Sequence, residues 1–393
     1  MKTFKCNCKD DQILFFESSH CIACQKTVGI DDEFSAVEPY EFDESTGLYY
    51  KQSAPQSHYK KCDNNAQYGA CNGMVNMDSF IPKADSEEVL CFACKFNETI
   101  PDLSINEHIP LWTKMETAKR RALYTLKALG VPLNNLVQDP QSGLSFDFIT
   151  DRSVIDHFAT KLEGQDNVFT GHDCGHITIN LAEADDVARS QTKLAMGERY
   201  RTLLGHFRHE LGHYYFDQLI VGCPKKHALC KQYFGDDSLD YQLAIDAHYK
   251  NGAPANWHEH FISEYATMHP FEDWAETWAH YMHIIDTLET AKNFSITGST
   301  TGNEFDIEDA DELRLPQNSY YFYAQTSIDS LLDSWMEFSV ILNSLNRSMG
   351  LADAYPFVLT QSVRTKLSFI HHAIHNRLNL MPELNAITTV DKD

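Results

Sequence analysis

Basic side chains are few in this sequence of 393 residues. It holds 32 Lys and Arg against 56 Asp and Glu, which gives a formal net charge of -24 and an isoelectric point near 5.1. A surface of this charge repels the phosphate backbone of nucleic acids. We therefore expect no nucleic-acid partner.

Long hydrophobic runs are also missing. No stretch of 18 or more apolar residues occurs, and the opening MKTFKCNCKD has no apolar run of the kind that signal peptides carry. We therefore expect no membrane partner and a cytoplasmic protein. The hydrophobic fraction of 43% is nevertheless ample for packed cores in two or three domains.

Cysteine is scarce after residue 95, where only Cys174, Cys223 and Cys230 occur, but eight cysteines precede that point. Cytoplasmic thiols are ordinarily reduced, so this clustering favours metal binding over disulfides. The eight can form two closed four-thiolate sites, of the kind that stabilises folds: Cys6, Cys8, Cys21 and Cys24, and Cys62, Cys71, Cys91 and Cys94. Interleaved pairing, or loss of one site at the short Cys6-x-Cys8 spacing, stays open, so we expect one or two structural zinc ions.

The cysteines also mark a predicted domain boundary. Residues 1–98 are predicted to be a zinc-ribbon region of knuckles and loops with little helix, and residues 99–393 to be the second domain. Apolar periodicity in the second domain predicts helices over 111–129, 198–220, 262–288, 326–347 and 355–381. The alternation in HITINLA predicts a strand from residue 176, a candidate edge for binding a peptide, and the polar stretch 295–319 predicts a loop. The expected fold class is α+β, mostly helical with a small sheet.

The strongest local motif is HELGH at residues 209–213, inside a predicted helix. Side chains four residues apart share a helix face, so His209 and His213 can bind one metal ion while Glu210 lies beside it. Zinc with three protein ligands and one open position lowers the pKa of bound water to about 7. We predict that Glu210 takes the proton of that water and delivers it to the leaving amine.

A third ligand is predicted in HPFEDWAETWAHYMH, residues 269–283. Two E-x-x-A patterns overlap there, so Glu272 and Glu276 compete for one position. With Glu272 as the ligand, Ala275 lets the two helices approach closely, and Glu276 can hold the second nitrogen of a ligand imidazole. Glu272 is the preferred ligand, and the alternatives that stay open are Glu276, Asp273, His280 and His283.

Tyr265 lies seven residues before Glu272. A phenol at this position can donate a hydrogen bond to the oxyanion that forms when an amide is attacked, so Tyr265 is a candidate catalytic residue. The alternative is a buried tyrosine whose hydroxyl has a structural partner.

HELGH followed by E-x-x-A-E is similar to the gluzincin group of zinc peptidases. The whole chain resembles the bacterial zinc-binding metallopeptidases that join an amino-terminal zinc ribbon to such a catalytic domain. The resemblance rests on IPDLS (100–104), LWTKMETAKRRALYTL (111–126), TGHDCGHITINLAEADD (170–186), GERYRTLLGHFRHELGHYYFD (197–217), DYQLAIDAHY (240–249) and ISEYATMHPFEDWAETWAHYMHIIDTLETA (262–291).

The resemblance implies a zincin-like fold, zinc at His209 and His213, Glu210 as the general base and, by analogy, Glu272 as the third ligand. This chain departs from the family in two places. The family ribbon usually opens with C-x-x-C where this chain has Cys6-x-Cys8, and the 58 residues between His213 and Glu272 leave room for an inserted subdomain or lid.

We therefore expect a zinc metallopeptidase that acts on peptides or proteins and holds one catalytic zinc ion. One alternative is a zinc hydrolase of other substrates, and another is a non-catalytic zinc-binding module that recruits a protein. Glu210 favours an enzyme, because a purely structural site has no use for an acid beside its first ligand.

Overall fold

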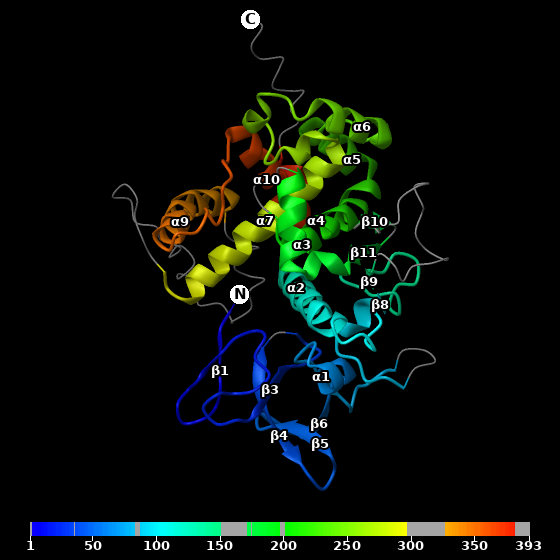
Figure 1. Ribbon diagram of the computed structural model, residues 1–393, viewed down its shortest axis with the longest axis vertical. Coiled ribbons are helices and arrows are strands. Elements are labelled where there is room, and N and C mark those ends of the chain that lie inside the picture. The colour runs from blue at the N-terminus through cyan, green and yellow to red at the C-terminus, as the bar shows by residue number, and fades with distance from the viewer. Residues whose placement is uncertain are drawn as a thin grey trace, which may run out of the picture. The chain divides into compact units, whose positions relative to one another are not determined.

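The computed structural model describes residues 2–34, 36–82, 87–150, 171–173, 175–196, 201–296 and 327–381. Cys174 and most of the loop predicted over 295–319 lie outside these residues. The chain forms two units, one drawn from residues 1–127, 133–197 and 202–204, the other from 128–132, 198–201 and 205–393. We describe each unit by itself (Figure 1).

The Cys-rich part of the first unit contains a sheet that the sequence analysis did not predict. After the short pair β1 (Phe4–Lys5) and β2 (Ile13–Leu14), five antiparallel strands follow in chain order: β3 (Thr27–Ile30), β4 (Val37–Asp43), β5 (Leu48–Lys51), β6 (Ala54–Lys61) and β7 (Met74–Asn76). Tyr40, Tyr59 and Met74 form its small core. Helix is indeed scarce here, since α1 (Asp63–Tyr68) is the only α helix among the described residues before residue 77.

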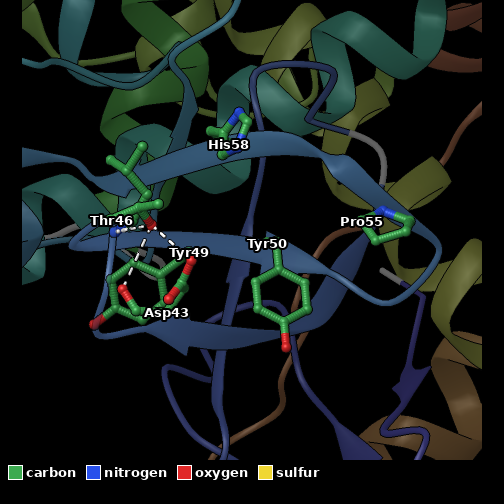
Figure 2. A pocket seen from close by; sticks show the side chains of 7 residues that line it. Asp43, Thr46, Tyr49, Tyr50, Pro55 and His58 are labelled. Atoms are coloured by element: carbon green, nitrogen blue, oxygen red, sulfur yellow. Dashed lines mark hydrogen bonds between the residues drawn. The ribbon is translucent and has the colours of Figure 1, made fainter.

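A hollow lies at the strands β4, β5 and β6 of this sheet, and Figure 2 shows it from close by. It is lined by Asp43, Thr46, Leu48, Tyr49, Tyr50, Pro55 and His58. The Asp43 carboxylate accepts hydrogen bonds from the backbone N–H of Ser45 and from the Thr46 hydroxyl. Because these bonds close the turn between β4 and β5, the polar groups at that end of the hollow have a structural role.

A second sheet lies in the same unit, with strand order β10-β11-β9-β8. β8 (Asn97–Thr99), β9 (Ser145–Ile149) and β11 (His176–Asn180) run parallel, and β10 (Gly171–Asp173) pairs antiparallel with β11. The strand predicted in HITINLA is therefore present. The prediction that it forms an edge is wrong, because β11 has a neighbour on both sides.

Helix α2 (His108–Leu129) shares the first unit with the cysteines. It ends as predicted at Gly130, whose φ of +69° suits a residue without a Cβ. Glu116 and Lys119 of this helix are fully buried and bond each other at 2.8 Å, and Glu116 Oε2 lies 3.8 Å from Cys94 Sγ. The buried ion pair thus joins α2 to one cysteine cluster. Helix α3 (Asp186–Met196) completes the unit.

The described helices of the second unit are α4 (Leu203–Phe216), α5 (Pro224–Phe234), α6 (Tyr241–Asn251), α7 (Pro270–Asn293), α9 (Ile328–Ser348) and α10 (Gln361–Ile374) (Figure 1). α4 continues into a π-type turn at Asp217–Val221, and short 3₁₀ turns occupy Trp257–Glu259, Tyr265–Thr267 and Leu378–Leu380. Aromatic rings of four helices meet in the core: Tyr215, Phe216, Phe234, Trp274, Trp278 and Phe369.

Three predicted helices begin several residues later in the structure than the periodicity indicated. α4 begins at Leu203, whereas the prediction started at residue 198. α7 begins at Pro270 instead of residue 262, because proline suits the first helical position and His269 caps the helix end. α10 begins at Gln361 instead of residue 355, where Thr360 accepts a bond from the backbone N–H of Val363. The combination of α helices with small sheets after a Cys-rich ribbon confirms the α+β class. Among the described residues, none of the helices has the length and apolar content needed to cross a bilayer.

Candidate metal centre

The HELGH segment lies in the second half of α4, where most residues are buried. Phe207, Leu211, Tyr214 and Tyr215 pack into the core of the unit, while His209 retains partial exposure. His209 and His213 are one helical turn apart, so both imidazoles extend from the same face. The apolar periodicity therefore fixes which face of α4 carries the histidines.

α7 carries the carboxylates that meet this face. His269 is its N-cap, Pro270 is its first residue, and Glu272 and Asp273 lie in its first turn. The positive end of the helix dipole favours acidic side chains at this position. Asp273 bonds the buried Lys366 of α10 at 2.5 Å, which leaves Glu272 as the first-turn acid that faces α4.

The two helices are in close contact at Gly212. A Cβ atom at this residue would lie 2.9 Å from Ala275 Cα and 3.2 Å from Trp278 Cβ. The Trp274 indole N–H also donates to the Gly212 carbonyl at 2.8 Å. The predicted role of Ala275 as the residue of close contact is confirmed, and the contact explains the glycine inside HELGH.

Donor atoms of three side chains converge beside this contact. His209 Nε2 lies 3.1 Å from His213 Nε2 and 3.0 Å from Glu272 Oε2, and His213 Nε2 lies 3.4 Å from Glu272 Oε1. Ligands that are 2.0–2.1 Å from a tetrahedral zinc ion are separated from each other by about 3.3 Å. The observed separations fit a zinc ion, and Glu272 Oε2, which is buried, has no hydrogen-bond partner among the described residues.

The electrostatic environment of Glu272 also fits a metal site. Although burial acts to raise the pKa of Glu272, His213 and His209 hold that pKa well below its usual range. This direction suits a metal ligand, because a carboxylate binds a divalent cation in its ionised form.

Glu276 occupies the other side of His209. Its Oε1 lies 2.7 Å from His209 Nδ1, and its Oε2 accepts a hydrogen bond of 2.6 Å from the Ser263 hydroxyl. A carboxylate on Nδ1 fixes the tautomer of the ring and leaves the Nε2 lone pair for a metal. The structure thus separates the two competing glutamates: Glu272 faces both Nε2 atoms, and Glu276 holds the far nitrogen of one ring.

Glu210 is buried beside the three donors, with 8% of its surface exposed. Burial raises its pKa above the usual value for glutamate, although His209 and His213 act in the opposite direction. A raised pKa makes a carboxylate a better base near neutral pH.

The other candidate ligands lie elsewhere. Asp273 bonds Lys366, the Nδ1 atom of His280 lies 2.8 Å from the Tyr355 hydroxyl, and Nδ1 of His283 lies against the Arg208 guanidinium. None of these three belongs to the group of donors formed by His209, His213 and Glu272.

Tyr265 lies next to the donors, with its ring centroid 5.9 Å from that of His209. A second phenol, which the sequence did not predict, contacts the Glu272 carboxylate directly. Tyr241 donates to Glu272 Oε1 at 2.7 Å. The signal that could have found it is its place in DYQLAIDAHY, one of the stretches that carry the resemblance.

The cysteines gather in the two sets that the spacing suggested. Cys6 lies 3.7 Å from Cys24 and Cys8 lies 4.0 Å from Cys21, measured between Sγ atoms. In the second set, Cys71 lies 4.0 Å from Cys91 and 3.9 Å from Cys94, and Cys62 belongs to the same group. Thiolates 2.3 Å from a tetrahedral zinc ion are about 3.8 Å apart, so both sets fit one.

Comparison with known proteins agrees with these clusters. The family model described as "Putative zinc-binding metallo-peptidase" matches residues 108–373, and a zinc-ribbon domain model matches residues 3–105. Uncharacterised proteins of Mycobacterium bovis and Mycobacterium tuberculosis are 36% identical over 375 residues, covering 95% of this chain and 95% of each relative. No solved structure matches. The chain belongs to this family of zinc-binding metallopeptidases with an amino-terminal zinc ribbon.

Proposed function

We propose that the protein is a zinc-dependent peptidase that hydrolyses peptide bonds in peptides or proteins. The observation that carries this proposal is the convergence of His209 Nε2, His213 Nε2 and a Glu272 oxygen within 4.8 Å of one another. Glu210, next to the first ligand on the same helix, supplies a base that a purely structural site does not need.

His209, His213 and Glu272 would hold the catalytic zinc ion. When bound, zinc would acidify a water molecule and polarise the carbonyl of the scissile amide. Glu210 accepts the proton of the attacking water and passes it to the leaving amine. Glu276 and Ser263 keep His209 in one tautomer, and the Tyr265 phenol stabilises the negative charge that develops on the carbonyl oxygen.

Two further zinc ions would have structural roles in the cysteine clusters. Both sets have four thiolates and no open position, which is the arrangement of sites that stabilise folds. Reduced thiolates require a reducing compartment, so we place the protein in the cytoplasm. The ribbon would stabilise its unit or present substrate.

Metal analysis combined with digestion of a peptide library tests the proposal. We expect the wild-type protein to cleave peptides, and Glu210→Gln to keep the same zinc content while turnover falls by at least about 10²-fold, the lower range for a lost general base. Retained turnover in the variant would remove Glu210 as the base. Zinc binding without peptide cleavage by the wild type would instead favour another substrate or a non-catalytic module.

A further inference from the structure

Tyr241 connects a surface helix to a buried carboxylate. It is the first residue of α6, in which every residue is at least partly exposed, and its own side chain is 39% exposed. Its hydroxyl nevertheless donates to Glu272 Oε1 at 2.7 Å, and Glu272 is only 1% exposed. The phenol therefore reaches inward from the surface to the candidate metal centre.

Two neighbouring side chains hold this phenol in place. Asp240 caps α6 by accepting the backbone N–H of Leu243 at 2.9 Å, which fixes where the helix begins. His269 accepts the backbone N–H of Phe271 on Nδ1, so its proton lies on Nε2, which donates to the Leu239 carbonyl at 3.1 Å. His269 thus ties the residues before Tyr241 to the turn of α7 that carries Glu272.

The two oxygens of Glu272 consequently differ. Oε2 lies 3.0 Å from His209 Nε2 and accepts no hydrogen bond from the described residues, so both of its lone pairs are available to a cation. Oε1 lies 3.4 Å from His213 Nε2 but accepts the Tyr241 hydroxyl, which engages one lone pair. Among the described residues, the structure therefore distinguishes an oxygen without a hydrogen bond from a hydrogen-bonded one.

We propose that Tyr241 is a positioning residue that restricts Glu272 to coordination through Oε2 alone. A carboxylate that bound through both oxygens would occupy the position that a catalytic zinc site leaves open for water. The inference rests on the proposed function. It adds that the hydrogen bond from Tyr241 to Glu272 keeps one coordination position open for water. Tyr265 has a different role in this scheme, because its ring lies beside His209.

The test uses the full-length protein, in which Co²⁺ replaces zinc at the His209–His213–Glu272 site while the cysteines retain zinc. The absence of thiolate-to-cobalt absorption bands verifies that cobalt has not entered the cysteine clusters. The variants are Tyr241→Phe and, as a matched control on the same helix, Tyr249→Phe, whose side chain is 65% exposed. Visible absorption of Co²⁺ and X-ray absorption at the cobalt edge report the number of ligands, and a peptide digest reports turnover.

We expect Tyr241→Phe to bind one Co²⁺ in this site as the wild type does, with weaker visible absorption and one more oxygen ligand. Turnover should fall about 10- to 100-fold, as for other residues that orient metal ligands. Tyr249→Phe should match the wild type in every measurement. Unchanged spectra for Tyr241→Phe would overturn the inference.

The number of Glu272 oxygens bound to cobalt in the wild-type protein gives a second, independent test. One Glu272 oxygen bound to cobalt supports the inference, and two bound oxygens overturn it even if Tyr241→Phe does not fold. Failure of the wild type to take up metal at this site would be a different result, since it would overturn the proposed function itself.

Discussion

Glu272 and Glu276 lie one turn apart on α7, yet they meet different atoms of the same imidazole. Glu272 Oε2 is 3.0 Å from His209 Nε2, whereas Glu276 Oε1 is 2.7 Å from Nδ1. A ligand binds the metal directly, but a carboxylate on the far nitrogen acts through the ring. Substitution should therefore separate the two roles.

We predict that Glu272→Ala lowers zinc affinity of this site more than Glu276→Ala does. Loss of the outer carboxylate should weaken binding about 10- to 100-fold, and loss of a direct ligand should exceed that range. Competition titration with a zinc-sensitive chelator measures both. The reverse order would make Glu276 the third ligand.

The sequence could predict the residue types of this site better than their roles. HELGH places two imidazoles and an acid by helix geometry alone, so His209, Glu210 and His213 need no tertiary information. The rotation of α7 about its axis decides which glutamate faces them, and that depends on Ala275 and Trp278 packing on Gly212. Tyr241 is 31 residues from Glu272 in sequence, and no motif links the pair.

Among the secondary structure elements, α4 and α7 matter most because the metal centre depends on their separation. We predict that Gly212→Ala weakens zinc binding and lowers the melting temperature. Alanine would gain about 1 kcal/mol of helix propensity, but overpacking against the Ala275 backbone costs about 1–3 kcal/mol.

Thermal unfolding by circular dichroism and a zinc titration measure the two effects of Gly212→Ala. The control is Gly222→Ala, where a Cβ meets no atom within 4 Å and φ is -65°. If Gly212→Ala matched the control in melting temperature and zinc affinity, the close contact of α4 and α7 would not be needed for stability or metal binding, and the prediction would be wrong.

The ends of the helices were harder to predict than their existence. Apolar periodicity continues upstream of α7 through Ile262 and Ala266, both of which are buried, so it could not indicate that the helix begins at Pro270. The sequence does not predict the cap at His269 either, because histidine is not among the usual N-cap residues.

At the scale of the whole molecule, the three clusters of donors differ in how firmly they should hold zinc. The cysteine sets offer four thiolates each, and the third set offers two imidazoles and one carboxylate. We predict that a mild chelator removes one zinc ion and abolishes peptide cleavage without unfolding. Elemental analysis and circular dichroism after dialysis measure this.

A thiol-reactive mercurial should then release the remaining zinc and unfold the Cys-rich sheet, because the binding energy of a structural site is folding energy, about 10–16 kcal/mol in zinc-finger peptides. Hydrogen exchange should show lost protection in β3–β7 and, through Glu116 beside Cys94, in α2. Persistent protection of these strands after zinc release would contradict a structural role.

The fold class could be predicted from the sequence, but the sheet of the Cys-rich region could not. The strands β4 and β6 have polar residues on both faces, and Pro39 and Pro55 lie within them. Proline weakens any strand prediction, and the cysteine spacing indicated only knuckles. The tyrosine core that joins the strands becomes visible only once they pair.

The contact at Gly212 also bears on the geometry of the metal centre. The helix backbones at Gly212 and Ala275 are already in contact, so α4 and α7 cannot move closer together at this point. We therefore expect the Gly212 contact to set a lower limit on the separation of α4 and α7, and with it on the spacing of the donors that the two helices carry.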